Sequence, residues 1–295
     1  MFLVTGATGD LGRRIVRQIT EREMPVRGFV RLNSRYSELE NRGAEIFIGD
    51  LRRDKDIRKA CEDVKYIIST HSDGRNPQAV DYAANVDLID AAKEYEIQHF
   101  VFISVLGVDR GYEDSPTFKA KRQVEKYLEA SGLNYTILRP AGFASSLMPQ
   151  AQRFKQTGGV YLLIGEPKNR TSIVSTDDVA KIAIDSPMVP EARDRIFPVG
   201  GPEIISREDI PYIFGAILKE EPTIIKSPLM VVDGLRGVAG LFSSQTEQTL
   251  GTFRVLLANE FFCTPQEIET VERIFNLKME SLESFLRRNF KLGNG

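Results

Sequence analysis

The chain has 295 residues, of which 42% are hydrophobic and 27% charged, and its formal net charge is −2. This composition is typical of a globular protein with enough apolar material for a large core, and the charge gives no electrostatic reason to expect nucleic acid as the main partner. Two cysteines without a C-x-x-C pair and only two histidines give no basis for a disulfide framework or a metal site, so neither is predicted.

In the first 140 residues, short apolar runs alternate with segments of helical periodicity. Strands are predicted at "FLV", "VRGFV", "AEIFI", "VKYIIS", "FVFIS" and "YTIL". Helices are predicted at Asp10–Glu23, Asp54–Glu62, Gln78–Tyr95 and Thr117–Ala130, with a short polar helix after the second strand. Six strands separated by helices predict an α/β fold with a doubly wound parallel sheet of the Rossmann type.

After Pro140 the pattern is less regular. A helix is predicted at Ala144–Gln156, and the aspartates of "TSIVSTDDVAKIAI" are predicted to cap a second one. Near the end of the chain, Thr264 and Glu267 form a capping-box pattern. We expect a dinucleotide-binding core at residues 1–140 and a smaller α+β lobe for substrate or partner at 141–295, with segments around 170–200 returning to the core.

The stretch "VTGATGDLG" places glycines between the first strand and the first helix. Gly6 would permit the tight turn, Gly9 would let the backbone approach a diphosphate, and Gly12 would let the helix pack closely on the strand. Free N–H groups at the start of the helix bind phosphate. The alternative, a glycine-rich turn without a ligand, does not explain why the pattern lies between a strand and a helix.

Polar residues follow each of the next strands, where an open parallel sheet binds its ligands. From Met24 through Ser37 there is no Asp or Glu, whereas "VRLNSR" ends the second strand with Arg31, Ser34 and Arg35. Guanidinium groups bind the 2′-phosphate of NADP, and a carboxylate there would repel it. We therefore predict NADP(H) in preference to NAD(H), although these arginines would also suit a solvated loop.

Asp50 would either hydrogen-bond near the adenine or cap the next helix. The predicted cofactor-binding residues are Gly6, Thr8, Gly9, Asp10, Leu11, Gly12, Arg31, Ser34, Arg35, Asp50, Leu51, Ser69, Thr70, Lys121 and Pro140. His71 follows the fourth strand and is either a loop residue or close enough to reach the substrate region. His99 opens the fifth strand and is predicted to be structural.

The sequence resembles the atypical short-chain dehydrogenase/reductase superfamily in its NmrA-like NAD(P)-binding branch. The resemblance is carried by "VTGATGDLG", "GAEIFIGDL", "HFVFISVLGV", "KAKRQVEKYLEASGLNYTILRPAGF" and "TSIVSTDDVAKI", in the family's order. The stretch "PLMVVDGLRGVAGLF", residues 228–242, is similar to the cyanobacterial and chloroplast group that helps to assemble photosystem II. The family includes quinone reductases and sensors that bind a dinucleotide without turning it over.

In the wider superfamily, catalysis uses Tyr-x-x-x-Lys on one helix face, and the resemblance places Lys121 at the lysine and Thr117 where the tyrosine would stand. The threonine hydroxyl is too weak an acid to replace a phenol. Lys121, which would contact the nicotinamide ribose with Glu125 orienting it, and Ser104, at the end of the fifth strand, remain the candidate catalytic residues. The alternative without a functional role is that Lys121 belongs to the solvated face of an amphipathic helix.

Two functions follow from these features. The first is an NADPH-dependent oxidoreductase that reduces a quinone or another conjugated small molecule bound in the C-terminal lobe. The second is a non-catalytic NADP(H)-bound redox sensor or assembly chaperone that contacts a protein partner through residues 228–242. No transmembrane segment and no nucleic-acid partner are predicted, and we expect a cytoplasmic protein or one on the stromal side, peripheral to the thylakoid membrane.

Overall fold

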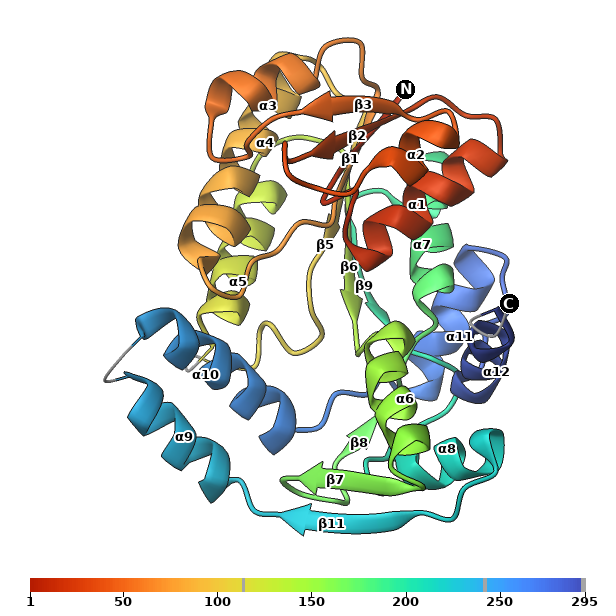
Figure 1. Ribbon diagram of the computed structural model, residues 1–295. Helices are drawn as coiled ribbons and strands as arrows, with labels where there is room; N and C mark the ends of the chain where they lie inside the picture. The colour runs from red at the N-terminus through yellow and green to blue at the C-terminus, as the bar shows by residue number, and fades with distance from the viewer. Residues whose placement is uncertain (113–114, 241–242, 293–295) are drawn as a thin grey trace.

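The computed structural model describes residues 1–112, 115–240 and 243–292 (Figure 1). Its centre is a seven-stranded sheet in which every neighbouring pair is parallel. In spatial order the strands are β3 (Glu45–Ile48), β2 (Val26–Val30), β1 (Phe2–Thr5), β4 (Tyr66–Ser69), β5 (His99–Ile103), β6 (Tyr135–Pro140) and β9 (Arg195–Val199). The predicted doubly wound fold is therefore confirmed, with β9 as a seventh strand beyond the six expected.

Successive residues of each strand contribute to two separate apolar cores. In β1, Val4 packs with one core and its neighbour Leu3 with the other, because side chains of a strand alternate between the faces of the sheet. Helices cover both faces, which is why the strands are mainly apolar. One face carries α1 (Asp10–Glu21), α2 (Ser37–Asn41) and α7 (Thr176–Asp185), and the other α3 (Asp54–Ala60), α4 (Ala84–Glu94) and α5 (Pro116–Glu129) (Figure 1).

The helix predicted at Gln78–Tyr95 consists of two pieces. It begins as a π-helical segment, η1 (Pro77–Ala83), and continues as α4. Asn76 caps its start by accepting a hydrogen bond from the backbone N–H of Ala79. The wider turn packs against α5 and buries the carboxylate of Asp81 completely. A π-helical turn is rare and often lies at a functional site, so the loop before it is a candidate part of such a site.

Part of the chain after β6 forms a smaller lobe with its own apolar core. Two short sheets belong to it: β7 (Val160–Ile164) pairs in parallel with β11 (Thr223–Ser227), and β8 (Arg170–Thr171) pairs antiparallel with β10 (Ile205–Ser206). The helices that build this core are η2 (Ala144–Leu147), α6 (Met148–Gln156), α8 (Ile210–Leu218) and α12 (Leu282–Leu292). The short helices η3 (Ser186–Met188) and η4 (Pro190–Ala192) and the helix α11 (Pro265–Ile274) pack on the main sheet or its core. The other two helices are α9 (Met230–Gly240) and α10 (Ser244–Ala258), which contact each other. The predicted division of the chain at residue 140 stays a prediction.

Two cap predictions have opposite outcomes. The capping box at the start of α11 is confirmed, since Thr264 and Glu267 each accept a hydrogen bond from the other's backbone N–H. The prediction that Asp177 and Asp178 cap α7 is wrong, because Ser175 occupies the cap position and makes no side-chain cap. Asp177 instead binds arginines of α1 and α12, and Asp178 accepts a hydrogen bond from the backbone N–H of Glu280.

None of the helices in the described part of the chain is long and apolar enough to cross a bilayer. The segment singled out at 228–242 contains α9, and its last two residues lie outside the described ranges. Met230, Val231 and Leu235 of α9 are exposed to solvent.

Candidate dinucleotide-binding site

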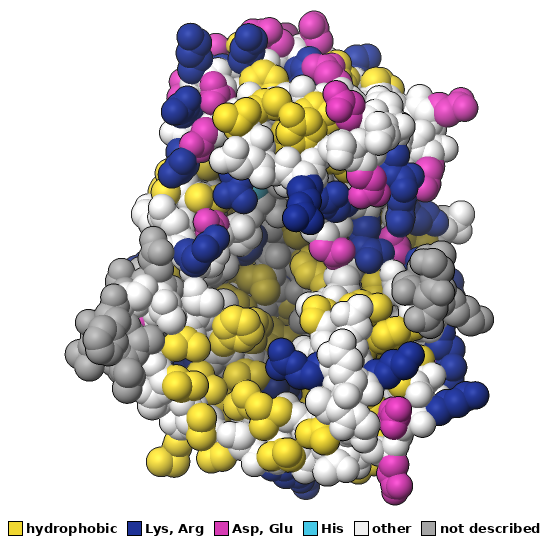
Figure 2. All heavy atoms as spheres, viewed as in Figure 1, with side chains coloured by type: hydrophobic (Ala, Val, Ile, Leu, Met, Phe, Trp, Pro, Cys, Tyr) yellow, Lys and Arg dark blue, Asp and Glu magenta, His cyan; other side chains and the backbone are white. Residues whose placement is uncertain are grey.

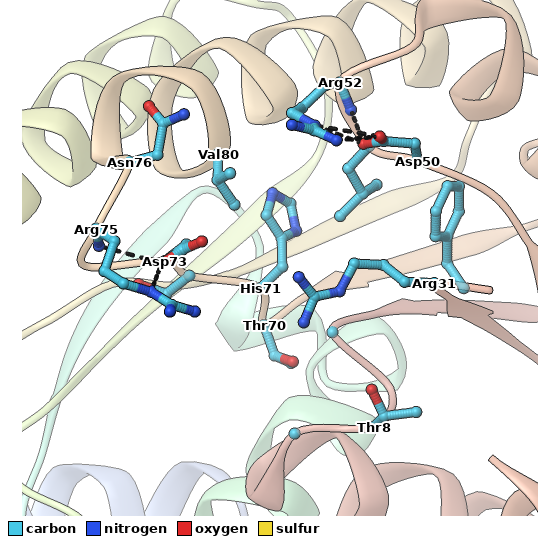
Figure 3. A pocket seen from close by; sticks show the side chains of 15 residues that line it. Thr8, Arg31, Asp50, Arg52, Thr70, His71, Asp73, Arg75, Asn76 and Val80 are labelled. Atoms are coloured by element: carbon cyan, nitrogen blue, oxygen red, sulfur yellow. Dashed lines mark hydrogen bonds and ion pairs between the residues drawn. The ribbon is translucent and has the colours of Figure 1, made fainter. Parts of the chain in front are cut away.

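A pocket of about 420 Å³ lies at the carboxyl edge of the main sheet, where the strand order reverses between β1 and β4. Open parallel sheets bind their ligands at such a switch point. Figure 3 shows the side chains that surround it. The lining consists of Gly6, Thr8, Gly9, Phe29, Arg31, Asp50, Leu51, Arg52, Thr70, His71, Ser72, Asp73, Arg75, Asn76 and Val80.

Two glycines allow the turn between β1 and α1 to fold as tightly as it does. Gly6 has φ +70°, and a Cβ there would lie 2.7 Å from Thr70 Oγ1 and 2.8 Å from the backbone nitrogen of His71. A Cβ on Gly12 would lie 2.2 Å from the carbonyl oxygen of Gly6. The first turn of α1 therefore packs directly against the loop, and its free N–H groups are held next to the pocket. This arrangement suits the diphosphate of a dinucleotide.

Arg31 is the predicted phosphate-binding residue that lines the pocket. Its guanidinium is exposed and forms no ion pair or hydrogen bond with the residues that the structure describes. Ser34 and Arg35 lie just outside the lining, and the carbonyl of Arg35 accepts a 2.7 Å hydrogen bond from Arg13. Arg13 also donates to the carbonyl of Thr8, so it joins the glycine loop to the loop after β2. No sequence pattern predicted this bridging role of Arg13.

Asp50 lines the pocket in a bidentate ion pair with Arg52, with a shortest distance of 2.6 Å. The hydrogen bonds from Arg52 lower the pKa of Asp50 to about 2, and burial opposes this effect only in part. Asp50 does not cap α3, because Arg53 occupies that position. Its carboxylate is therefore an ionised acceptor at the wall of the pocket that Leu51 and Phe29 also form.

Lys121 is buried beneath the edge of β5. Its ammonium donates a 2.8 Å hydrogen bond to the carbonyl of Ile103 and lies over the ring of Phe102. Burial lowers its pKa, and the charges of Asp81 and Glu125 act in the opposite direction. The interpretation of Lys121 as part of a solvated face is therefore wrong. The expected contact between Lys121 and Glu125 is not formed either, because each side chain binds another partner.

Glu125 is fully buried and binds Arg139 of β6 through two hydrogen bonds of 2.9 and 2.7 Å, and it also accepts a bond from Arg122. A guanidinium can form two parallel hydrogen bonds with a carboxylate, whereas an ammonium acts as a single point charge. The i,i+4 spacing alone therefore predicted the wrong partner. Lys121 keeps N–H donors that its bond to Ile103 does not use.

The remaining predicted residues do not line the pocket. Ser104 is buried at the end of β5, and its hydroxyl has no partner among the described residues. Ser69 donates a 2.6 Å hydrogen bond to Asn85 and so faces the helix layer. Asp10, Leu11 and Gly12 belong to the first turn of α1, and Pro140 is buried at the end of β6.

Sequence reasoning missed the stretch from Ser72 to Asn76, which forms one wall of the pocket. Asp73 lies 3.5 Å from Arg75 in an ion pair, and both belong to the lining (Figure 3). The buried carboxylate of Asp81 fixes this wall by accepting hydrogen bonds from the Ser72 hydroxyl and the Asp73 backbone. The signal was available, because these residues directly follow the strand-end pair Ser69 and Thr70.

A Rossmann-type sheet with a glycine turn at its switch point is the architecture of a nicotinamide-dinucleotide-binding protein. The comparison with protein families agrees: the chain belongs to the NAD(P)H-binding family, whose model matches residues 6–187. A nicotinamide dinucleotide is thus its cofactor class. The resemblance to atypical short-chain dehydrogenases/reductases near the photosystem II assembly-factor group is confirmed by the relatives.

Among curated proteins, the chain is similar to the photosystem II assembly factor Ycf39 of Cyanophora paradoxa, with 29% identity over 98% of this chain and 92% of the relative. It is also 28% identical to the NAD(P)H azoreductase of Xenophilus azovorans over 71% of each protein. Among solved structures, the NADPH complex of quinone oxidoreductase QOR2 from Escherichia coli superposes with a TM-score of 0.79 over 98% of this chain and all of that one. At 16% identity this last likeness shows a shared fold.

Proposed function

We propose that this protein binds NADP(H) in preference to NAD(H) and acts as an NADPH-dependent reductase of a quinone or another conjugated small molecule. The observation that carries the cofactor choice is the unpaired guanidinium of Arg31 in the pocket wall. The other two arginines of the lining, Arg52 and Arg75, are paired with aspartates, so Arg31 leaves the wall with an excess positive charge. A 2′-phosphate would neutralise that charge.

The chemistry must proceed without a phenol. When bound, the cofactor supplies a hydride, and the chain's own residues hold it: the glycine loop at the diphosphate and Lys121 at the ribose. With Thr117 in place of a tyrosine, no strong acid is placed at this point to protonate the product. A conjugated acceptor fits this arrangement, because it spreads the charge that it gains with the hydride and can take its proton from water afterwards.

Replacing Arg31 with aspartate tests the cofactor choice. We expect Arg31→Asp to weaken NADPH binding by about 30-fold or more, because a charge-assisted phosphate contact is lost and a repulsion is added, and to change NADH binding by less than about threefold. Cofactor fluorescence titration measures both. Lys168→Asp makes the same charge change at an exposed site outside the pocket lining and should leave both affinities unchanged. Equal losses for both cofactors in Arg31→Asp would refute the assignment.

The role of Lys121 in turnover is tested by Lys121→Met, which keeps the apolar stem and removes the ammonium. We expect NADPH oxidation in the presence of quinones to fall by at least about tenfold, since the nicotinamide is no longer positioned. Lys119→Met is the control, because Lys119 lies on the exposed side of the same helix. Absence of acceptor-dependent NADPH oxidation by the wild-type protein across quinones, enones and azo compounds would contradict the reductase function.

An alternative is favoured by a different observation: the NADP(H)-loaded protein serves as a redox sensor or assembly chaperone. Figure 2 shows hydrophobic side chains gathered over the part of the surface where α9, α10 and the β7–β11 pair lie. The exposed residues are Leu162, Ile225, Met230, Val231, Leu235, Phe253 and Leu256, which we call the apolar face. An exposed apolar patch marks a surface for a protein or a membrane.

This alternative predicts association with thylakoid membranes or their assembly intermediates, measured by co-sedimentation with and without NADPH. A charge in the apolar face, Leu235→Lys, should reduce the bound fraction. Met188→Lys introduces the same charge at an exposed apolar residue of η3 and should not. If both variants sediment like the wild type, the chaperone function is excluded, whatever the result of the NADPH oxidation assay.

A further inference from the structure

Two opposite charges are buried beside the pocket, and each lacks an ion-pair partner in direct contact. Asp81 of η1 is fully buried, and Lys121 of α5 is 8% exposed. None of the ion pairs within the described ranges includes either side chain. A charge that is removed from water without an opposite charge nearby is strongly unfavourable. Each of these groups therefore needs a counter-charge from its surroundings.

The carboxylate of Asp81 is held by uncharged donors. It accepts hydrogen bonds from the hydroxyl of Ser72 and, at 2.9 Å, from the backbone N–H of Asp73. The backbone carbonyl of Asp81 accepts a 2.8 Å bond from the side chain of Asn85, which fixes the π-helical turn that carries the carboxylate. These donors orient the carboxylate, but they leave its negative charge in place.

The ammonium of Lys121 has two contacts that suit a cation. It donates to the carbonyl of Ile103 at 2.8 Å, and it lies 5.1 Å from the centre of the ring of Phe102. A carbonyl oxygen and the face of an aromatic ring each carry partial negative charge. Neither contact supplies a full negative charge.

The surroundings of this ammonium leave one carboxylate to balance it. The titratable and charged groups nearby come from η1, α5, β6 and the loop after β4: they are His71, Asp81, Arg122, Glu125 and Arg139. Burial and the charge of Lys121 lower the pKa of His71 to about 3, so its ring is uncharged near neutral pH. Glu125 is already bound by the two arginines. Asp81 is the carboxylate that remains.

The helical segments that carry the two charges pack against each other, since η1 lies on α5. We propose that Asp81 is a positioning residue, whose carboxylate is the counter-charge that keeps the ammonium of Lys121 protonated at the end of β5 while it also holds the pocket wall at Ser72 and Asp73. Burial lowers the pKa of Lys121, and the charge of Asp81 is the largest effect that opposes this. The importance of this pair for turnover rests on the proposed role of Lys121 at the ribose.

Two variants separate the charge of Asp81 from its hydrogen bonds. Asp81→Asn removes the charge, but the amide oxygen still accepts from the N–H of Asp73, and the amide NH₂ donates to the hydroxyl of Ser72, which is also an acceptor. Ser72→Ala is the matched control, because it removes one hydrogen bond of the same carboxylate and keeps the charge.

Nuclear magnetic resonance of protein labelled with ¹³C-lysine follows the titration of the ammonium through its ¹³Cε resonance, without any nucleotide. The signal of Lys121 is the one missing from Lys121→Met. In Asp81→Asn, Lys121 should lose its proton at a lower pH than in the wild type, because the ammonium has lost its counter-charge. In Ser72→Ala it should titrate as in the wild type.

Three results of this measurement would overturn the inference. In the first, Lys121 titrates at the same pH in Asp81→Asn and in the wild type. In the second, it stays charged in Asp81→Asn up to pH 10.5, the ordinary pKa of a lysine. In the third, Ser72→Ala lowers its titration as much as Asp81→Asn does, which would assign the effect to the hydrogen bonds of the wall.

Urea unfolding decides the question if Asp81→Asn alone folds poorly. In Lys121→Met the carboxylate of Asp81 is left without its counter-charge, so the addition of Asp81→Asn should raise the urea concentration at the unfolding midpoint. A double variant that unfolds at the same or a lower urea concentration than Lys121→Met would show that the two charges are not partners.

The outcomes also separate this inference from the proposed function, because neither measurement uses a nucleotide or a quinone. If the wild-type protein neither binds NADP⁺ nor oxidises NADPH, the proposed function is wrong, and the titration of Lys121 still decides the role of Asp81. If the protein reduces quinones while Asp81→Asn leaves that titration unchanged, the proposed function stands and the role of Asp81 is wrong.

Discussion

The carboxyl edge of the main sheet and the apolar face of the smaller lobe have opposite surface chemistry. At the sheet edge, polar side chains are collected around a pocket, and a few of their buried atoms have no hydrogen-bond partner within the described ranges. On the lobe, large apolar side chains are exposed, with Met230 at 78%. The edge is fixed by topology, since each parallel strand ends there, whereas the lobe depends on pairings between distant segments. The edge suits a small anionic ligand, and the apolar face suits a large partner.

Glycines show how differently the two regions are packed. We expect Gly12→Ala to reduce the free energy of unfolding by roughly 4 kcal/mol or more and to abolish NADPH binding, because its Cβ would lie 2.2 Å from a backbone oxygen that cannot move away. The matched change in α9, Gly234→Ala, meets nothing within 4 Å and should stabilise the helix by about 0.5–1 kcal/mol. Urea unfolding measures both. Similar effects of the two changes would remove the contrast in packing.

The same difference explains how far the sequence could predict the structure. The predicted strands were identified because most of them are buried on both faces and read as apolar runs, although β3 at the edge of the sheet is partly exposed. The addition of β9 beside β6, and the pairing of β7 with β11, join segments separated by long stretches of chain, which local patterns do not specify. The strand pairing of the smaller lobe could therefore not be predicted from the sequence.

Within the site, the sequence was informative where backbone geometry demands a residue type. Gly6, Gly9, Arg31, Asp50 and Thr70 all line the pocket, and their role in cofactor binding stays a prediction. The sequence was less informative where two cations compete for one carboxylate, since Glu125 lies one helical turn from Lys121 yet binds Arg139 of β6. The wall from Ser72 to Asn76 was missed because a loop has no periodicity, and its course is set by the buried Asp81 and the π-helical turn.

Ion pairs extend the comparison to electrostatics. Arg139→Met leaves the fully buried carboxylate of Glu125 with only Arg122, and we expect a loss of about 3 kcal/mol in the free energy of unfolding. Arg287→Ala on α12 breaks a pair in which both partners are about half exposed, with an expected cost below about 0.5 kcal/mol. Thermal and urea unfolding of both variants measure the difference.

A double variant sharpens that result. Replacing both partners, Arg139→Met with Glu125→Leu, should recover most of the lost stability, because the cost arises from an uncompensated buried charge. If the double variant is as unstable as Arg139→Met alone, the geometry of the pair matters more than the desolvation of the carboxylate.

The smallest predicted effect concerns two adjacent aspartates where α7 meets the C-terminal helices. Burial raises the pKa of Asp178 to about 6, and the charges of Glu280 and Asp177 add to this effect, against the hydrogen bond from the Glu280 backbone. Between about pH 4 and 6 the folded protein then holds a proton that the unfolded chain has lost, so this group lowers stability as the pH rises through that window. Burial also opposes ionisation of Asp177, but Arg288 and Arg14 outweigh it and lower the pKa.

The two aspartates should therefore respond to amidation with opposite signs. Near pH 8, Asp178→Asn should stabilise the protein by roughly 1–2 kcal/mol, because the amide keeps an acceptor for the Glu280 N–H without the charge, and Asp177→Asn should destabilise it by a similar amount. Near pH 3.5, Asp178 is protonated in the folded state and largely protonated in the unfolded chain, so most of the benefit of its replacement should vanish. The cost at Asp177 should shrink there, because the carboxyl of the unfolded chain takes up a proton before the folded one, whose pKa is lowered. Unfolding midpoints across this range measure both. Changes of the same sign at pH 8 would show that hydrogen-bond geometry, and not charge, governs this joint between the sheet and the C-terminal helices.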